Sequence, residues 1–247
     1  MLIIVIFSLF CIEALIGFLA LDLLWQTRGT RRLLLKASVS IGLGMGGSSL
    51  AYFLYLILFA GRPYFIYFEL LFLLILFWIW YRRNQEIHLP HLQKLTLLQM
   101  GIVLLAVVVF FSSLFGLASY ALARQEGDWD AWMIYNRSAR FIYRGAELWQ
   151  NTFSNEIDTF FHPDYPPMLA LNIASIWDTV NTESRYVPMI QGLFFSIACV
   201  LVLVSALASL KSFAQAGLGL IFLWGAGNFF VYEGGRQTAD IPIAFLC

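Results

Sequence analysis

The stretch LIIVIFSLFCIEALIGFLALDLLW, residues 2–25, decides the fold class of this protein. A helix needs about 20 apolar residues to cross the hydrocarbon core of a bilayer, and this stretch has that length. Further stretches that meet the same requirement lie at residues 35–60, 64–81, 96–123, 187–210 and 214–232. Inside a bilayer only a helix satisfies every backbone hydrogen-bonding group without closing a barrel. The sequence therefore predicts an all-α, polytopic bundle of transmembrane helices.

Composition excludes several other classes of protein. Hydrophobic residues make up 60% of the 247 residues and charged residues only 12%, which lies far outside the range of water-soluble domains. The formal net charge is zero, and this argues against a nucleic-acid partner, which requires a basic surface. The three cysteines lie far apart in apolar runs, so the sequence predicts neither a disulfide framework nor a thiolate metal site.

Basic residues between the predicted spans indicate the orientation. Lysine and arginine concentrate in cytoplasmic loops, and here they gather at residues 28–36 and 82–94. Both loops are therefore expected in the cytoplasm, which places residues 124–186 on the external face. We expect an integral membrane protein, of the bacterial inner (plasma) membrane, whose long polar loop faces the periplasm or exterior.

The external loop 124–186 is expected to form juxtamembrane helices, because it shows neither sustained strand alternation nor a glycine-rich phosphate loop. Residues 129–149 have an amphipathic pattern of aromatic residues and arginines, which suits a helix at the headgroup level. Residues 166–180 are too few for a comfortable span and predict a second juxtamembrane helix.

The course of residues 166–180 also decides which charged residues share a membrane face. If the segment does not cross, the span that ends at residue 232 delivers Arg236 and Asp240 to the face that holds Asp128 and Asp130. If it does cross, the two groups lie on opposite faces.

Two short motifs in the external loop carry candidate catalytic residues. Asp128 and Asp130 lie at the start of a predicted helix, where an N-cap explains a carboxylate as well as catalysis does. His162 and Asp164 lie on a proline-rich turn, where Asp164 could equally be a capping residue.

A third motif, with Arg236 four residues before Asp240, lies at the start of an apolar helix. It could be an interfacial pair, yet an acid that enters a span is costly and points to function. On one membrane face, such residues could bind a phosphate through arginine while a carboxylate deprotonates an acceptor hydroxyl.

Three segments resemble the first and second external loops of membrane glycosyltransferases with the GT-C fold: GDWDAWMIYNRSARFIYRGAELW (127–149), HPDYPPMLALNIASIW (162–177) and GGRQTADIPIAFL (234–246). They are similar to the branch with the protein O-mannosyltransferases and the bacterial aminoarabinose transferases. The resemblance implies three N-terminal spans in residues 1–95, followed by the N-terminal part of a GT-C-like catalytic module in residues 96–247. The last residues are apolar but too few to span, so we expect the natural protein to continue.

The resemblance implies roles for individual residues. The first-loop acid, the catalytic base or acceptor-binding carboxylate, corresponds to Asp130, with Asp128 as the close alternative. The second acid corresponds to Asp240, which would position donor or metal, and the preceding arginine corresponds to Arg236. Ala131 follows Asp130 where the family has a second acid, which leaves dependence on a divalent metal open.

Further residues are candidates for binding the donor phosphate. His162 resembles the histidine of a His-Pro-Pro element in the mannosyltransferases, although Asp164 and Tyr165 are inserted here. Arg137 and Arg140 could contact a lipid phosphate, and anchoring among lipid headgroups explains them equally well.

The expected function is transfer of a sugar from a polyprenyl-phosphate donor to a lipid, glycan or protein acceptor. A polysaccharide ligase or polymerase would use the same donor, and a membrane scaffold would need none of these residues. A multi-span transporter would use intramembrane acids such as Glu13 and Glu69, for which a structural carboxylate is our preferred interpretation.

Overall fold

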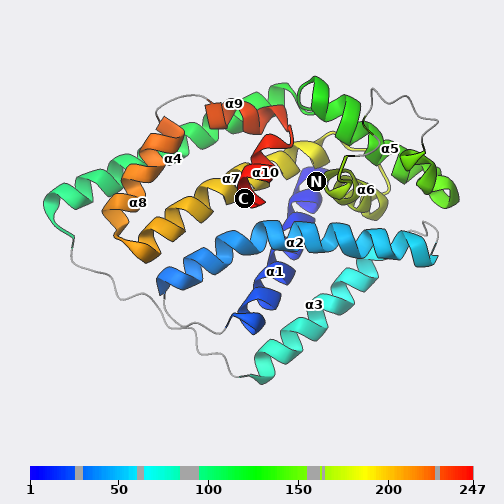
Figure 1. Cartoon of the computed structure of the whole chain (residues 1–247), viewed down its shortest axis with the longest axis horizontal. Coiled ribbons are helices and arrows are strands. Elements are labelled where there is room, and N and C mark those ends of the chain that lie inside the picture. Colours follow the sequence, from blue (N-terminus) through cyan, green and yellow to red (C-terminus); the bar gives the residue numbers. More distant parts are fainter. Residues whose placement is uncertain are drawn as a thin grey trace.

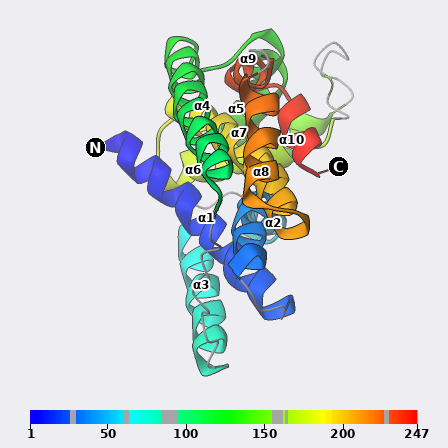
Figure 2. The same ribbon diagram turned by 90° about the vertical axis from the view of Figure 1, so that its left-hand side faces the viewer.

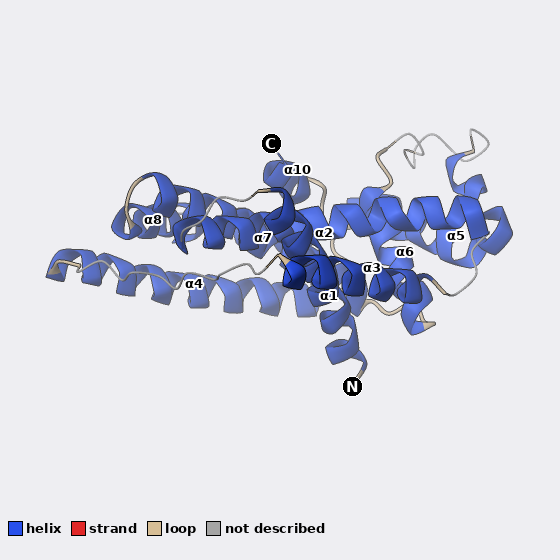
Figure 3. Cartoon of the chain, turned by 90° about the horizontal axis from the view of Figure 1, so that it is seen from below, coloured by secondary structure: helices blue, strands red, loops and turns tan. Residues whose placement is uncertain are grey.

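A computed structural model describes residues 1–25, 30–59, 64–83, 95–154, 162, 165–225 and 229–246. All regular elements among these residues are helices, which confirms the all-α class (Figure 3). The long ones are α1 (Leu2–Leu24), α2 (Thr30–Phe59), α3 (Phe65–Arg82), α4 (Leu97–Ala123) and α7 (Tyr186–Leu210). Each of these five contains a stretch long and apolar enough to cross a membrane.

The sixth predicted span, at residues 214–232, is described only in part, because residues 226–228 lie outside the described residues. The structure has α8 (Phe213–Leu220), which runs into a π-helical turn (Ile221–Gly225), and then α9 (Phe229–Arg236). The piece Phe213–Gly225 is too short to count as a span by itself.

The segment from α8 to α9 nevertheless follows α4 from one end to the other. Gly217 in α8 packs against Ala106 in the first half of α4, and Gly235 in α9 packs against Tyr120 near its end. Figure 2 shows α4, α8 and α9 together in the upper part of the molecule, with α3 at the bottom. The end of α9 therefore reaches the same end of the bundle as the end of α4.

Successive long helices run in opposite directions, as helices that cross one membrane in turn would. In Figure 1 the ends of α1, α3 and α7 and the beginnings of α2, α4 and α8 lie toward the left and the bottom. The opposite ends lie toward the top and the right, where α5 (Asn136–Gly145) and α6 (Met168–Val180) also lie. The described helices of residues 124–186, the segment predicted to be external, thus lie together at one end of the bundle.

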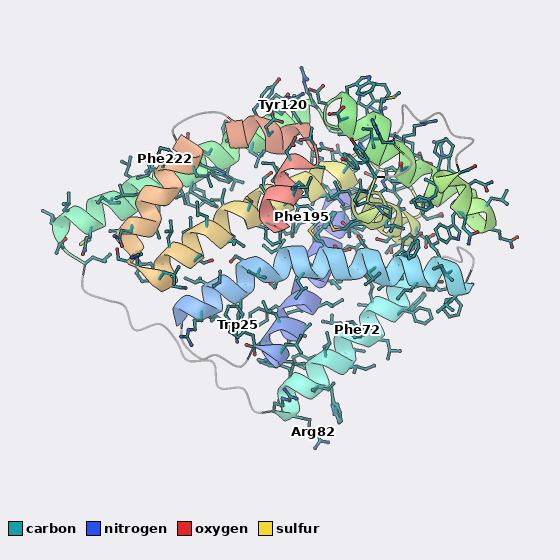
Figure 4. All side chains as sticks on the ribbon, viewed as in Figure 1. Trp25, Phe72, Arg82, Tyr120, Phe195 and Phe222 are labelled. Carbon is teal, nitrogen blue, oxygen red and sulfur yellow. The ribbon has the colours of Figure 1, made fainter. Side chains whose placement is uncertain are left out.

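Large apolar side chains cover the outer surfaces of the long helices. Phe72 on α3 is 50% exposed and Phe222 after α8 is 78% exposed, whereas Phe195 of α7 is buried in the middle (Figure 4). Exposed apolar surface of this extent marks contact with a membrane or another protein. It fits an integral membrane protein.

The helices that residues 129–149 form differ from the single amphipathic helix predicted there. Residues 129–149 form a π-helical turn (Ala131–Tyr135), then α5, and then a 3-10 helix (Ala146–Phe153). The second expected helix forms as α6, and its residues from Leu169 to Trp177 are all buried. α6 is buried because α2, α5 and α7 pack around it. One hydrophobic core therefore joins the N-terminal helices to the rest of the chain.

Candidate functional site

The ends of α4 and α9 meet at a tight turn. Gly127 has a φ of 77°, a conformation that glycine adopts without steric cost. A Cβ on Gly127 would overlap the carbonyl oxygen of Arg236, so the close approach of the two segments requires glycine. The backbone N–H of Asp128 donates a hydrogen bond to that same carbonyl oxygen at 2.9 Å.

Asp128 also forms an ion pair across this turn. Arg236 Nε donates to Asp128 Oδ2 at 2.8 Å, and Arg236 Nη1 donates to Glu233 Oε1 at 3.0 Å. The hydrogen bond from the Trp129 backbone N–H, together with the Arg236 and Arg124 charges, lowers the pKa of the Asp128 carboxyl. A carboxylate held in this way is a weak base, and its contacts join two distant segments of the chain.

A cavity of about 570 Å³ lies beside the turn. Its walls come from residues 129–135, from the residues before and at the start of α6, and from residues 238–243 around the start of α10 (Asp240–Leu246). The lining residues are Trp129, Asp130, Ile134, Tyr135, His162, Tyr165, Pro166, Met168, Leu169, Thr238, Ala239, Asp240, Pro242 and Ile243. Asp130, His162 and Asp240, all predicted site residues, thus share one cavity, while Asp128 and Arg236 do not line it.

Asp240 begins α10 and is oriented by a neighbouring hydroxyl. Thr238 Oγ1 donates to Asp240 Oδ2 at 2.8 Å. Gln237, whose φ is 60°, donates from Nε2 to the carbonyl oxygen of Gln125 at 3.1 Å, which ties this segment to the end of α4. The sequence analysis missed Thr238, although a threonine just before a helix-starting aspartate is a known local hydrogen-bonding pattern.

Tyr135 adds a phenol to the same cavity. Burial, followed by the proximity of Tyr165, Asp130 and Asp240, raises the pKa of Tyr135 to about 12. The phenol therefore stays protonated at neutral pH and can donate a hydrogen bond. The sequence did not single out Tyr135, because a π-helical turn changes which side chains of the segment share a face.

His162 lies shortly before the start of α6, and its backbone has a left-handed conformation. Its φ is 48°, and its ring stacks on Tyr165 with the ring centroids 4.4 Å apart. The ring lines the cavity. Asp164 lies outside the described residues, so the role that the resemblance implies for it stays a prediction.

The two loop arginines that were candidates for phosphate contact lie elsewhere. Arg140 Nη2 is 2.7 Å from Glu126 Oε1, and Arg140 Nε is 3.6 Å from Glu183 Oε2. The guanidinium of Arg137 lies over the Phe141 ring, 5.0 Å from its centroid. Neither arginine lines the cavity. Arg140 instead ties α5 to the turn before α7.

The described residues do not form a recognisable metal site. No group of three or more histidine, cysteine, aspartate or glutamate side chains in the described part of the chain is arranged to hold a metal ion. Asp130, His162 and Asp240 line the cavity without forming such a group. A divalent metal therefore has no ligand set among the described residues.

Comparison with known proteins identifies no relative. No protein-family model matches the sequence, and neither a curated protein nor a solved structure gives a significant match. The resemblance to GT-C glycosyltransferases rests on the three loop segments alone.

Proposed function

We propose that this protein is an integral membrane glycosyltransferase that moves a sugar from a polyprenyl-phosphate donor to a lipid, glycan or protein acceptor on the external face. The observation that carries the proposal is the cavity into which residues 127–149, 162–177 and 234–246 converge. These are the segments on which the family resemblance rests. They are far apart in the sequence, and nothing in their hydropathy requires them to meet.

Asp130 is the proposed catalytic base. It lines the cavity, whereas Asp128 is held by the Arg236 guanidinium and by a backbone N–H. Asp130 accepts the proton of the acceptor hydroxyl while the hydroxyl oxygen attacks the anomeric carbon. The bond from that carbon to the lipid phosphate breaks with inversion, and the phosphate leaves with the electron pair.

His162 and Asp240 are proposed to position the donor. His162 is the only basic side chain among the described lining residues, so it can hydrogen-bond the phosphate of the donor. Asp240, oriented by Thr238, can accept hydrogen bonds from sugar hydroxyls. In this proposal Arg236 is a positioning residue that acts through Asp128.

The apolar part of the cavity suits a lipid-linked substrate. Ile134, Leu169, Pro242 and Ile243 line it together with the polar groups. Ligand sites commonly combine apolar walls with a few polar groups that set orientation. Trp129 and Asp130, which line the cavity, follow a few residues after the end of α4, so a lipid chain could remain beside the long helices.

The proposal is tested by sugar transfer in membranes that carry the protein, with a panel of radiolabelled polyprenyl-phosphate sugars. We expect Asp130→Asn to lower the transfer rate by about 10²- to 10⁴-fold, the usual contribution of a general base. Asp240→Asn should raise the apparent KM for the donor as well as lower the rate.

Glu147→Gln is the matched control, because Glu147 is an exposed acid of the same loop that does not line the cavity. It should transfer at the wild-type rate. Wild-type rates in both aspartate variants, at equal protein level, would refute the proposed site. A polymeric product would instead identify a polysaccharide ligase or polymerase, and absence of transfer from every donor would refute the enzyme.

A further inference from the structure

Two glutamates lie together in the membrane-spanning part, outside the candidate catalytic cavity. Glu13 of α1 is 1% exposed and Glu69 of α3 is 9% exposed. The two carboxyls interact electrostatically. Ser48 of α2 donates a hydrogen bond to Glu69 Oε1, and it also contacts Glu13. The serine hydroxyl therefore links the two acids.

Among the described residues, no basic side chain is close enough to neutralise this pair. The basic residues of α2 lie in its first two turns, and Lys36 is 2.6 Å from its own partner, Asp22. From Lys36 to Ser48 the helix rises by about 18 Å. Arg82 is at the far end of α3, about 20 Å along the helix from Glu69. The sequences of α6 and α7, which also pack on α1, contain one charged residue, Asp178 at the end of α6.

The remaining contacts of Glu13 are neutral. Asn172 Nδ2 of α6 donates to Glu13 Oε1 at 2.8 Å. Glu13 Oε2 is buried and has no hydrogen-bond partner among the described residues. This oxygen can receive or hold a proton without loss of a contact that the structure shows.

Glu69 and Ser48 also line a second cavity, between α1, α2 and α3, of about 750 Å³. The other lining residues are apolar or aromatic apart from the Tyr55 hydroxyl. An apolar setting disfavours two negative charges at close range, and it gives no solvent to stabilise them. Two interacting carboxyls bind protons as a pair and not as independent groups.

We propose that Glu13 and Glu69 form a proton-binding site that holds one proton at neutral pH, shared through the Ser48 hydroxyl. The carboxylic acid of one glutamate donates, directly or through Ser48, to the carboxylate of the other. The site binds a proton and no other cation. The proposed site does not require glycosyl transfer, because its contacts are those among α1, α2, α3 and α6.

A hydrogen-bonded chain connects this site to the wall of the candidate catalytic cavity. Asn172 Oδ1 accepts from Gln191 Nε2 at 2.9 Å, and the same nitrogen donates to the carbonyl oxygen of Leu169 at 3.1 Å. Leu169 lines the catalytic cavity. Loss of the shared proton would therefore place a second buried charge next to the residues that hold the start of α6.

The experiment is infrared spectroscopy of the wild-type protein in lipid nanodiscs at neutral pH, with and without ¹³C-labelled glutamate. A protonated carboxyl group has a carbonyl stretch that is separate from the amide and carboxylate bands. We expect a band of one carboxyl group per chain that shifts on labelling of glutamate. The label excludes Asp178, whose carboxyl pKa is raised to about 6 by burial.

The double variant Glu13→Gln/Glu69→Gln should lose the band, and Glu147→Gln should keep it. The isotope shift in the wild type decides the question even if the double variant does not fold. Absence of a glutamate band would overturn the proposal, and so would a band of two carboxyl groups per chain. Loss of the band when potassium is replaced by sodium at constant pH would show a sodium site instead.

Discussion

Gly127 sets the distance between the two segments that carry Asp128 and Arg236. We expect Gly127→Ala to destabilise the protein by about 2 kcal/mol, because a φ of 77° strains alanine and because its Cβ would overlap the Arg236 carbonyl oxygen. The measurement is the thermal unfolding midpoint of purified protein in nanodiscs.

The control for this residue is Gly101→Ala in α4, where no atom lies within 4 Å of the added Cβ. We expect its midpoint to be equal to or slightly above that of the wild type, because alanine favours a helix interior more than glycine does. If the two alanine variants unfold at the same temperature, the turn has room for a side chain and the close contact with Arg236 is not required for stability.

At the scale of elements, the crossing of α1 and α2 depends on small residues. A Cβ on Gly44 would overlap the carbonyl oxygen of Glu13, and one on Gly17 would overlap that of Ser40. Close approach of backbones at small residues is a common way to pack helices in membranes. We expect Gly44→Ala to force the helices apart and to lower the free energy of unfolding by about 1–3 kcal/mol, as overpacking does.

Gly47 lies one turn further along α2, and a Cβ there would meet no atom within 4 Å. Gly47→Ala therefore measures the effect of the methyl group alone. Denaturant unfolding of both variants in the same nanodiscs makes the comparison. A smaller loss of stability in Gly44→Ala than in Gly47→Ala would contradict the observed crossing point.

At the scale of the whole molecule, the alternation of the helices predicts which segments share a membrane face. We expect Glu147→Cys, in a variant with the natural cysteines replaced, to react with a membrane-impermeant maleimide in intact cells. Arg82→Cys should react only after the membrane is permeabilised, because α3 ends at the opposite end of the bundle (Figure 4). The labelled protein is measured by mass shift on a gel.

Reaction of both variants in intact cells would contradict the alternation. Reaction of Arg82→Cys alone would show that the orientation is inverted, and it would move the candidate cavity to the cytoplasmic face. Only this inverted result would be incompatible with an external acceptor, whatever the chemistry of the site.

Much of the helix content could be predicted because hydropathy is a local property. Five of the six predicted spans appear as long helices, with ends within a few residues of the expected positions. The sixth, at residues 214–232, includes residues 226–228, which lie outside the described residues, so it stays a prediction. Its course along α4 depends on packing, which a window of sequence does not contain.

The candidate site was only partly predictable. Its acidic residues and His162 were identified from motifs, yet the sequence left Asp128 and Asp130 as alternatives. The structure separates them: Asp128 pairs with Arg236, 108 residues away, while Asp130 lines the cavity. Arg137 and Arg140 do not line the cavity, and Arg140 pairs with Glu126 and Glu183, partners that the sequence did not indicate. Contact of these arginines with a lipid phosphate stays a prediction.

The sequence by itself determined the all-α class and the five long apolar helices, because a bilayer leaves the backbone no other way to satisfy its hydrogen bonds. Only the tertiary structure decided which polar groups meet: Asp130 with Asp240 in one cavity, and Glu13 with Glu69 between helices. The physical reason is the length of chain over which each property acts. Hydropathy acts over the length of one helix, whereas a cavity or a carboxyl pair requires side chains from several helices, and their packing is set by the whole chain.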